Sequence, residues 1–189
     1  MVVMDRSSTD LIRRDLVSEN AEIVSFLDQP IHLRPLRAED RAMLQDLVRR
    51  TDPHDLQMRF LGAFHSLPPT LLDALMRIDP DRQITLIAIR AASSAEPEIL
   101  AVSRAHVSSE GSAELALLVR SDLKGMGLGS MLLDRLIARC RGHGLRVLVA
   151  DVLQENTRML RLADRYGFLR GPAELGMTHL VLDLDALAA

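Results

Sequence analysis

Three glycines fall within five residues in the segment Lys124–Ser130 (KGMGLGS), directly before a run of apolar residues at helical spacing. The first N–H groups of a helix have no intrahelical acceptor and carry the positive end of the helix dipole. Glycines allow a ligand to approach these groups because no Cβ stands in the way, and they tolerate a positive φ. The segment therefore predicts a site for a phosphate or pyrophosphate, with a plain tight turn as the alternative.

The spacing of these glycines excludes two common phosphate-binding loops. A Walker A loop places a Lys and a Ser or Thr after its last glycine, whereas Lys124 precedes the glycines here. A dinucleotide-binding fingerprint reads G-x-G-x-x-G, which GMGLGS does not match. What remains is K-x-x-G-x-G, from Lys124 to Gly129, after an apolar segment.

Glu114 is the candidate general base. It lies in the segment AELALLV (113–119), which is predicted to form a strand and leads toward the glycines. Partial burial among apolar neighbours would raise the pKa of this carboxyl and make it a better proton acceptor near neutral pH. The alternative is a glutamate at a strand edge, exposed or paired with an arginine.

The other candidate side chains have structural explanations of their own. Asn156 begins an expected helix, where Asn commonly acts as the N-cap. Cys140 lies on the apolar stripe of the helix after the glycines and is expected to pack in the core. His106 lies on an expected strand, as a surface or hydrogen-bonded residue or, alternatively, in an acceptor site. Four further histidines are scattered without metal-ligand spacing, so no metal site is expected: His54, His65, His143 and His179.

Length and composition favour one soluble domain. The chain has 189 residues, of which 48% are hydrophobic, and its formal net charge is −3. This charge argues against nucleic-acid binding, because phosphate contacts need clustered Lys and Arg. One cysteine excludes an internal disulfide. No signal peptide and no apolar run long enough to span a bilayer are found, so a cytoplasmic protein without a membrane partner is expected.

The elements that must position these residues follow from the periodicity of the sequence. The expected order is a strand, two or three helices, three antiparallel strands, then helix, strand, helix and strand, which predicts a mixed α/β domain. Residues 1–22 are expected to form a flexible or loosely docked arm, and residues 23–189 a single domain. The expected strands cover residues 31–36, 83–90, 98–108, 113–119, 145–153 and 177–184.

The K-x-x-G-x-G pattern between a strand and a helix resembles the acetyl-CoA loop of the GNAT acyltransferase superfamily, [QR]-x-x-G-x-[GA], with Lys124 in place of the usual Gln or Arg. Together with RPLRAED, MRFLGAF, AELALLV and VLQENTRMLRLADRYGF, it resembles the GNAT domain of Pat-type bacterial protein lysine acetyltransferases over residues 31–184. The resemblance implies a mixed, mostly antiparallel central sheet flanked by helices, with a splayed strand pair that binds acyl-CoA.

The resemblance also implies roles for individual residues. Glu114 corresponds to the general base of the Pat-type group. Ala163 stands where many GNAT enzymes carry a tyrosine acid, and Tyr166, about 300° further around the helix, is not expected to replace it. Arg59 matches an Arg-Phe pair of the group, with an ion pair that holds its helix as the structural interpretation. The residues expected to bind acetyl-CoA are Leu117, Leu118, Val119, Lys124, Gly125, Met126, Gly127, Leu128, Gly129, Ser130 and Asn156.

The expected function is transfer of an acetyl group from acetyl-CoA to a primary amine, by direct attack of the amine with Glu114 as base. The resemblance implies a protein with an exposed lysine as the acceptor. Two alternatives stay open: a small-molecule amine as the acceptor, and a non-catalytic module that senses acyl-CoA.

Overall fold

A single mixed sheet organises the protein. The computed structural model describes residues 21–61, 68–79, 81–91, 96–109 and 111–186. Within them, eight strands form one sheet in the order β1-β2-β3-β4-β5-β6-β8-β7. Every neighbouring pair is antiparallel except β5 and β6. The strands are β1 (Glu22–Phe26), β2 (Gln29–Pro35), β3 (Gln83–Arg90), β4 (Glu98–Ser109), β5 (Ser112–Val119), β6 (Val147–Leu153), β7 (Leu169–Glu174) and β8 (Met177–Asp183).

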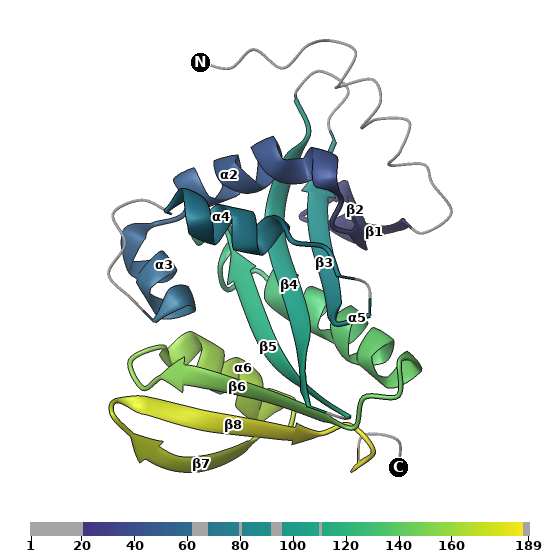
Figure 1. Ribbon diagram of the computed structural model, residues 1–189. Helices are drawn as coiled ribbons and strands as arrows, with labels where there is room; N and C mark the ends of the chain where they lie inside the picture. The colour runs from purple at the N-terminus through teal and green to yellow at the C-terminus, as the bar shows by residue number, and fades with distance from the viewer. Residues whose placement is uncertain (1–20, 62–67, 80, 92–95, 110, 187–189) are drawn as a thin grey trace.

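Helices cover both faces of this sheet. Figure 1 shows α2 and α4 over one face, with α5 over the opposite face. The helical segments are η1 (Ala38–Asp40), α2 (Arg41–Arg49), α3 (Pro53–Phe60), α4 (Pro69–Met76), η2 (Ser121–Leu123), α5 (Leu128–Gly142) and α6 (Thr157–Arg165). The expected mixed α/β fold with a mostly antiparallel sheet is therefore confirmed.

The apolar stripe of α5 builds the larger core, because its residues recur at the spacing that keeps one helical face against the sheet. Its six members are buried as the sequence predicted: Leu128, Leu132, Leu133, Leu136, Ile137 and Cys140. They pack with β3, β4, β5 and α6. A second core lies on the other face, where Leu44 and Leu47 of α2 and Leu56 of α3 pack against Ile87 and Leu118.

Two strands were not predicted. β1 forms a hairpin with β2, and β7 forms a hairpin with β8. The sequence of β7, LRGPAE, shows no apolar alternation because nearly all of its side chains are exposed. Its strand conformation depends on pairing with β8. Residues 1–20 of the expected arm lie outside the described residues, so the arm stays a prediction.

Strands β5 and β6 separate along their length. Their parallel pairing covers three residues of β5, from Ser112 to Glu114, opposite Val147–Val149. On its other side, β5 stays paired with β4 as far as Val119. Figure 1 shows β5 and β6 diverging toward the side where α3 lies. The expected splayed strand pair is thus present, and it begins just after Glu114.

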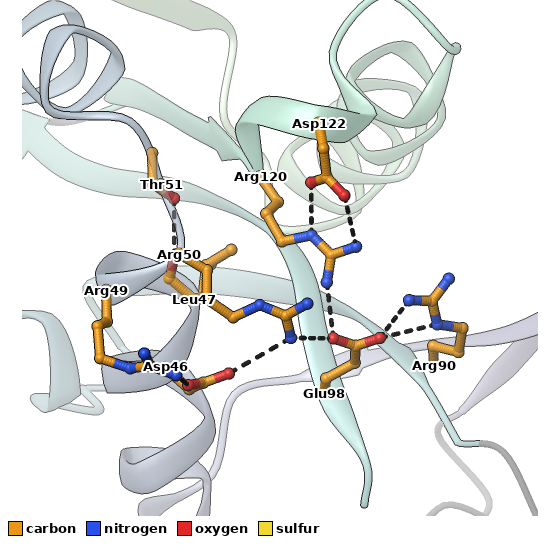
Figure 2. A network of polar contacts seen from close by, with 9 residues as sticks. All are labelled: Asp46, Leu47, Arg49, Arg50, Thr51, Arg90, Glu98, Arg120 and Asp122. Carbon is orange, nitrogen blue, oxygen red and sulfur yellow. Dashed lines mark hydrogen bonds and ion pairs between the residues drawn. The ribbon is translucent and has the colours of Figure 1, made fainter. Parts of the chain in front are cut away.

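An ionic network fixes the end of β5, directly before the glycine loop. The Glu98 carboxylate at the start of β4 accepts hydrogen bonds from Arg50, Arg90 and Arg120 (Figure 2). The buried Arg120 side chain also donates to both carboxylate oxygens of Asp122, at 2.6 and 2.9 Å. The network joins α2, β3 and β4 to the residue that follows β5, so the direction in which the chain leaves β5 is set before the loop begins.

Candidate active site

A cavity of about 750 Å³ opens where β5 and β6 separate. Its walls are the β5 segment from Glu114 to Val119, the glycine loop, three residues of β6 (Ala150–Val152), and residues of α3 and α6. Helix α3 contacts both β5 and β6, so it spans the open end of the strand pair. The loop, the splayed strands and Glu114 are therefore parts of one site.

The glycine loop has the geometry of an anion cradle. Gly125 and Gly127 have φ values of +80° and +95°, which L side chains rarely adopt, and a Cβ at either position would meet no atom within 4 Å. Gly127 is the N-cap of α5, and its carbonyl accepts the hydrogen bond of Met131 N at 3.0 Å. The preceding helical N–H groups are left without intrahelical acceptors beside the cavity.

Gly129 has a different role from the two preceding glycines. A Cβ there would lie 3.4 Å from Leu117 Cδ2 and 3.6 Å from Val119 Cγ2. This close approach allows α5 to pack directly against β5. Gly129 therefore brings the start of the helix to the splayed strand.

Most of the predicted binding residues meet at this cavity. The lining includes Leu117, Leu118, Val119, Lys124, Gly125, Gly127, Gly129, Ser130 and Asn156. The side chains of two others do not contribute. Met126 is 49% exposed and is not among the residues that line the cavity, while Leu128 is fully buried in the core. Leu128 can therefore take part through its backbone alone.

Lys124 is held by a carboxylate that the sequence analysis did not identify. Its Nζ lies 2.6 Å from Asp55 Oδ1 in α3. The Ser121 hydroxyl donates to the other carboxylate oxygen of Asp55 at 2.5 Å. Burial alone would raise the pKa of Asp55, but the hydrogen bonds from Lys124 and Ser121 hold it below its usual value. Helix α3 is thereby fastened to the loop.

Glu114 lies at the last residue pair before β5 and β6 separate. Its neighbours Ala113 and Leu115 are buried in the α5-side core, so the alternation of a strand places Glu114 on the opposite face. The side chain is exposed, so the expected partial burial is wrong. His106 stands directly across from it in β4 but does not line the cavity.

Arg59 lines the cavity from α3, and its charge acts on Glu114. The expected ion pair that holds the helix is not found: within the described part of the chain, no hydrogen bond or ion pair of Arg59 is present. The guanidinium instead lies over the ring of Phe60, with Cζ 4.8 Å from the ring centroid. The segment MRFL contained this residue, but its place in the same cavity as Glu114 depends on the docking of α3.

Asn156 and Tyr166 are both engaged. The Asn156 side chain accepts a hydrogen bond from Met159 N at 3.1 Å, which confirms the N-cap, and the residue also lines the cavity. The Tyr166 hydroxyl lies 2.6 Å from Asp134 Oδ1. Burial, reinforced by Asp134, raises the pKa of Tyr166 to about 12. Tyr166 does not line the cavity, and Ala163 is fully buried. No tyrosine acid is therefore placed here.

Three arginines on α6 complete the wall beside the loop. Arg158, Arg161 and Arg165 are exposed and line the cavity, and their spacing of three and four residues places them on one helical face. These arginines were not among the predicted site residues, although their spacing is visible in TRMLRLADR. Together with the helix start, they make this part of the cavity suited to an anion.

The described ranges contain no group of three His, Cys, Asp or Glu side chains placed to hold a metal ion. Their helices are all too short or too polar to cross a membrane. Cys140 is buried, and burial raises the pKa of its thiol to about 12, as suits a packing residue rather than a nucleophile.

The site defines a class of protein. A glycine cradle at a helix start can hold a pyrophosphate, and the unpaired edge of β5 can bind an extended chain as an added strand. Glu114 lies at the other end of that edge, where β5 and β6 begin to separate. These parts suit a ligand that has both a pyrophosphate and an extended arm, as an acyl-CoA does. They form the kind of site that an acyl-CoA-dependent acyltransferase needs.

Comparison with known proteins gives the family. The model of the acetyltransferase (GNAT) family matches residues 52–168, and the chain belongs to this family. It is 33% identical over 149 residues to acetyltransferase PA5475 of Pseudomonas aeruginosa, covering 77% of this chain and 80% of the relative.

Solved structures share the fold. The GNAT domain of S. lividans PAT superposes with a TM-score of 0.77 at 23% identity, over 86% of this chain and 96% of that domain. The acetyltransferase yncA of Salmonella typhimurium, determined with its cofactor acetyl-CoA, superposes with a TM-score of 0.62 at 19% identity, over 82% of this chain and 94% of the other.

Proposed function

We propose that the protein transfers the acetyl group of acetyl-CoA to a primary amine, with Glu114 as the general base. The position of Glu114 carries the proposal. It is the last residue of β5 that pairs with β6, and it lines the cavity that the separating strands open. A carboxylate there is exposed to an entering amine and lies on the strand that leads to the glycine loop.

Different residues of the chain serve cosubstrate binding, orientation of the acyl group and proton transfer. Acetyl-CoA supplies an activated acetyl thioester. The N–H groups at the start of α5 and the α6 arginines bind its phosphates, and the β5 backbone near Leu117–Val119 orients the acyl arm and donates a hydrogen bond to the carbonyl oxygen. Glu114 accepts a proton from the acceptor ammonium, so that the neutral amine attacks the carbonyl directly.

The leaving thiolate needs no dedicated acid. The tyrosine position of related enzymes is the buried Ala163, and the Tyr166 hydroxyl is bound to Asp134. Thiols ionise far more readily than alcohols, so a thiolate can depart near neutral pH. The absence of a tyrosine in this cavity, within the residues described, is therefore compatible with turnover.

Two classes of acceptor have support: a protein lysine and a small-molecule amine. The resemblance to Pat-type domains favours a protein lysine, and the likeness in fold to the S. lividans PAT domain is in keeping with it. Arg59, a cation that lines the same cavity as Glu114, favours a small amine that carries its own negative charge. A purely sensing role is the remaining alternative, since it needs the CoA cradle but not Glu114.

Single-turnover acetylation tests the base. Glu114→Gln is expected to lower the acetylation rate by about 10²–10⁴-fold and to flatten its dependence on pH, while the Kd for CoA stays near the parent value. Glu174→Gln, an exposed change on β7 outside the cavity, serves as the matched control.

Two results would contradict this proposal. Equal rates for Glu114→Gln and the parent protein across pH would remove the base assignment. Tight CoA binding by calorimetry without acetylation of free amino acids, amino-acid amides or lysine peptides would instead support the sensing role.

A further inference from the structure

We propose that Arg59 binds a carboxylate of the acceptor, so that the acceptor is a small amino acid carrying an amine and a carboxylate. The inference rests on the proposed function, because it concerns the acceptor of the same transfer. In this arrangement, Glu114 interacts with the acceptor's ammonium and Arg59 binds the acceptor's carboxylate.

The first observation is that Arg59 and Glu114 share a cavity without pairing. Both residues line it, Arg59 from α3 and Glu114 from β5. Their opposite charges act on each other, yet no ion pair joins them. Two unpaired opposite charges at one cavity form a site for a zwitterion, with a complementary group for each end of the ligand.

The second observation is that the Arg59 guanidinium lacks an anionic partner. A guanidinium offers five N–H donors, and among the described residues none of those of Arg59 meets an acceptor. The guanidinium instead contacts the Phe60 ring, with Cζ 4.8 Å from the ring centroid. The sequence of the next six residues, GAFHSL (62–67), contains no Asp or Glu.

An unpaired cation in a partly buried position lowers the stability of the folded protein, because burial removes part of its hydration. Arg59 is half-buried, and burial is the largest cause that lowers its pKa to about 10. The charge of Arg104 lowers the pKa further, while Glu114 opposes the change. A ligand carboxylate would offset this cost, and the planar guanidinium is suited to bind it through two hydrogen bonds.

The third observation is the balance of charge around Glu114. Arg104 projects from the same face of the sheet, and its guanidinium donates to Thr85 Oγ1 at 3.0 Å and to the Leu75 carbonyl, both of which are neutral. Asp55 and Asp151 also line the cavity, but their carboxylates are engaged by Lys124 and His179. Among the described residues, Arg59 and Arg104 are thus two guanidinium groups without a carboxylate partner, and Glu114 is the lining carboxylate without a cationic partner. The ammonium of a lysine side chain would add a third positive charge, whereas a zwitterionic amino acid adds none.

Matched acceptor pairs provide the test. The assay with acetyl-CoA compares free L-amino acids, the corresponding L-amino acid carboxamides and an N-acetylated lysine peptide. The kcat and KM are determined for each compound that is acetylated. The parent protein is expected to prefer an acid over its carboxamide by about tenfold or more in kcat/KM. Arg59→Met is expected to reduce this ratio to near one, mainly through a higher KM for the acid.

Further measurements separate binding from turnover. Calorimetry of the same amino acids with the CoA-bound protein is expected to show binding that Arg59→Met abolishes, whether or not turnover follows. Arg59→Lys, which keeps the charge but not the planar fork, is expected to retain part of the preference. Arg141→Met, an exposed arginine on α5 outside the cavity, is the control and should match the parent protein.

The outcomes distinguish this inference from the function on which it rests. Acetylation of the lysine peptide with no preference for acids over carboxamides overturns the carboxylate site and leaves the acetyltransferase standing. A second contrary result is that Arg59→Met loses affinity for CoA and keeps the parent protein's preference for acids over carboxamides. That result would show that Arg59 binds the cosubstrate, and it would overturn the inference too. Amino-acid binding that depends on Arg59, without any turnover, supports the site but contradicts the catalytic proposal.

Discussion

The Nζ of Lys124 lies 2.6 Å from Asp55 Oδ1, which fastens the first residue of the glycine loop to helix α3. Both residues line the cavity, so a negative charge stands beside the place where the phosphates are expected. Lys124 neutralises that charge. The ion pair therefore has two consequences, one for the position of α3 and one for the binding of anions.

Lys124→Met is expected to weaken CoA binding by about tenfold, because it removes a cation and leaves Asp55 unpaired beside the ligand phosphates. Asp55→Asn, which removes the opposing charge and releases Lys124, should bind CoA at least as tightly as the parent. Calorimetric titration at low and high salt measures both. Equal affinities for Lys124→Met and the parent would show that the ion pair holds α3 in place without serving the ligand.

The conformation of the loop leads to a second prediction. Gly127→Ala forces an L side chain to a φ of +95°, at a cost of about 1–2 kcal/mol in stability, and it places a methyl group at the cradle. Thermal unfolding should show a loss of several degrees, and CoA affinity should fall. Gly142→Ala is the matched control.

Gly142 lies in the last turn of the same helix, without a positive φ and with open space around it. Alanine there should leave CoA binding unchanged and stabilise the protein by up to about 1 kcal/mol. Parent-like affinity for Gly127→Ala would contradict the role of the loop as a phosphate cradle.

The α6 arginines predict a salt-dependent contribution to affinity. Replacing Arg158, Arg161 and Arg165 together by Gln should raise the Kd for CoA by about tenfold at low ionic strength, at roughly 0.5 kcal/mol for each exposed charge. The dependence of the Kd on salt should also become weaker. Arg77→Gln/Arg141→Gln, two exposed arginines outside the cavity, provides the comparison. A salt dependence unchanged by the triple substitution would exclude the arginines from phosphate binding.

The Glu98 network predicts how stability depends on pH. Burial raises the pKa of Glu98, but its arginine partners outweigh burial and leave it below the ordinary value of 4.5. A carboxyl whose pKa is lowered in the folded state contributes stability above its unfolded pKa and loses it as the pH falls through the folded pKa. Glu98→Gln should therefore be less stable than the parent near neutral pH, by roughly 1–3 kcal/mol, with the difference shrinking below about pH 4.5.

Urea unfolding over the acid range measures this change. Glu155→Gln, an exposed glutamate without arginine partners among the described residues, should follow the parent curve at every pH. A difference between Glu98→Gln and the parent that stays constant down to about pH 3 would show that the carboxylate charge is not what the network stabilises.

Because the chain contains a single lysine, acetylation of its own lysine side chain can be followed at one position. Lys124 is its only lysine, among 23 Lys and Arg residues in total. Its ammonium is engaged with Asp55, and the side chain is 20% exposed. We expect peptide mass spectrometry after incubation with acetyl-CoA to find little modification of Lys124. Substantial acetylation there would show that the ion pair opens readily.

Local pattern in the sequence was sufficient for the core helix, the loop and the strand that carries Glu114. The α5 stripe repeats every three to four residues, and this period alone determines which side chains face the sheet. The glycine spacing determines a backbone conformation, because only glycine adopts a positive φ without strain. These features depend on residues that are neighbours along the chain, so the sequence could show them.

Tertiary structure decided what depends on residues far apart in the sequence. β7 has exposed side chains and becomes a strand by pairing with β8, so no periodicity predicts it. The exposure of Glu114 follows from the point at which β6 separates from β5. The ion pair between Lys124 and Asp55 depends on where α3 docks, and so does the presence of Arg59 and Glu114 in one cavity. The sequence by itself thus determined the glycine loop and the strand that carries the candidate base. Which charged side chains share the cavity was decided by long-range packing, which local spacing does not encode.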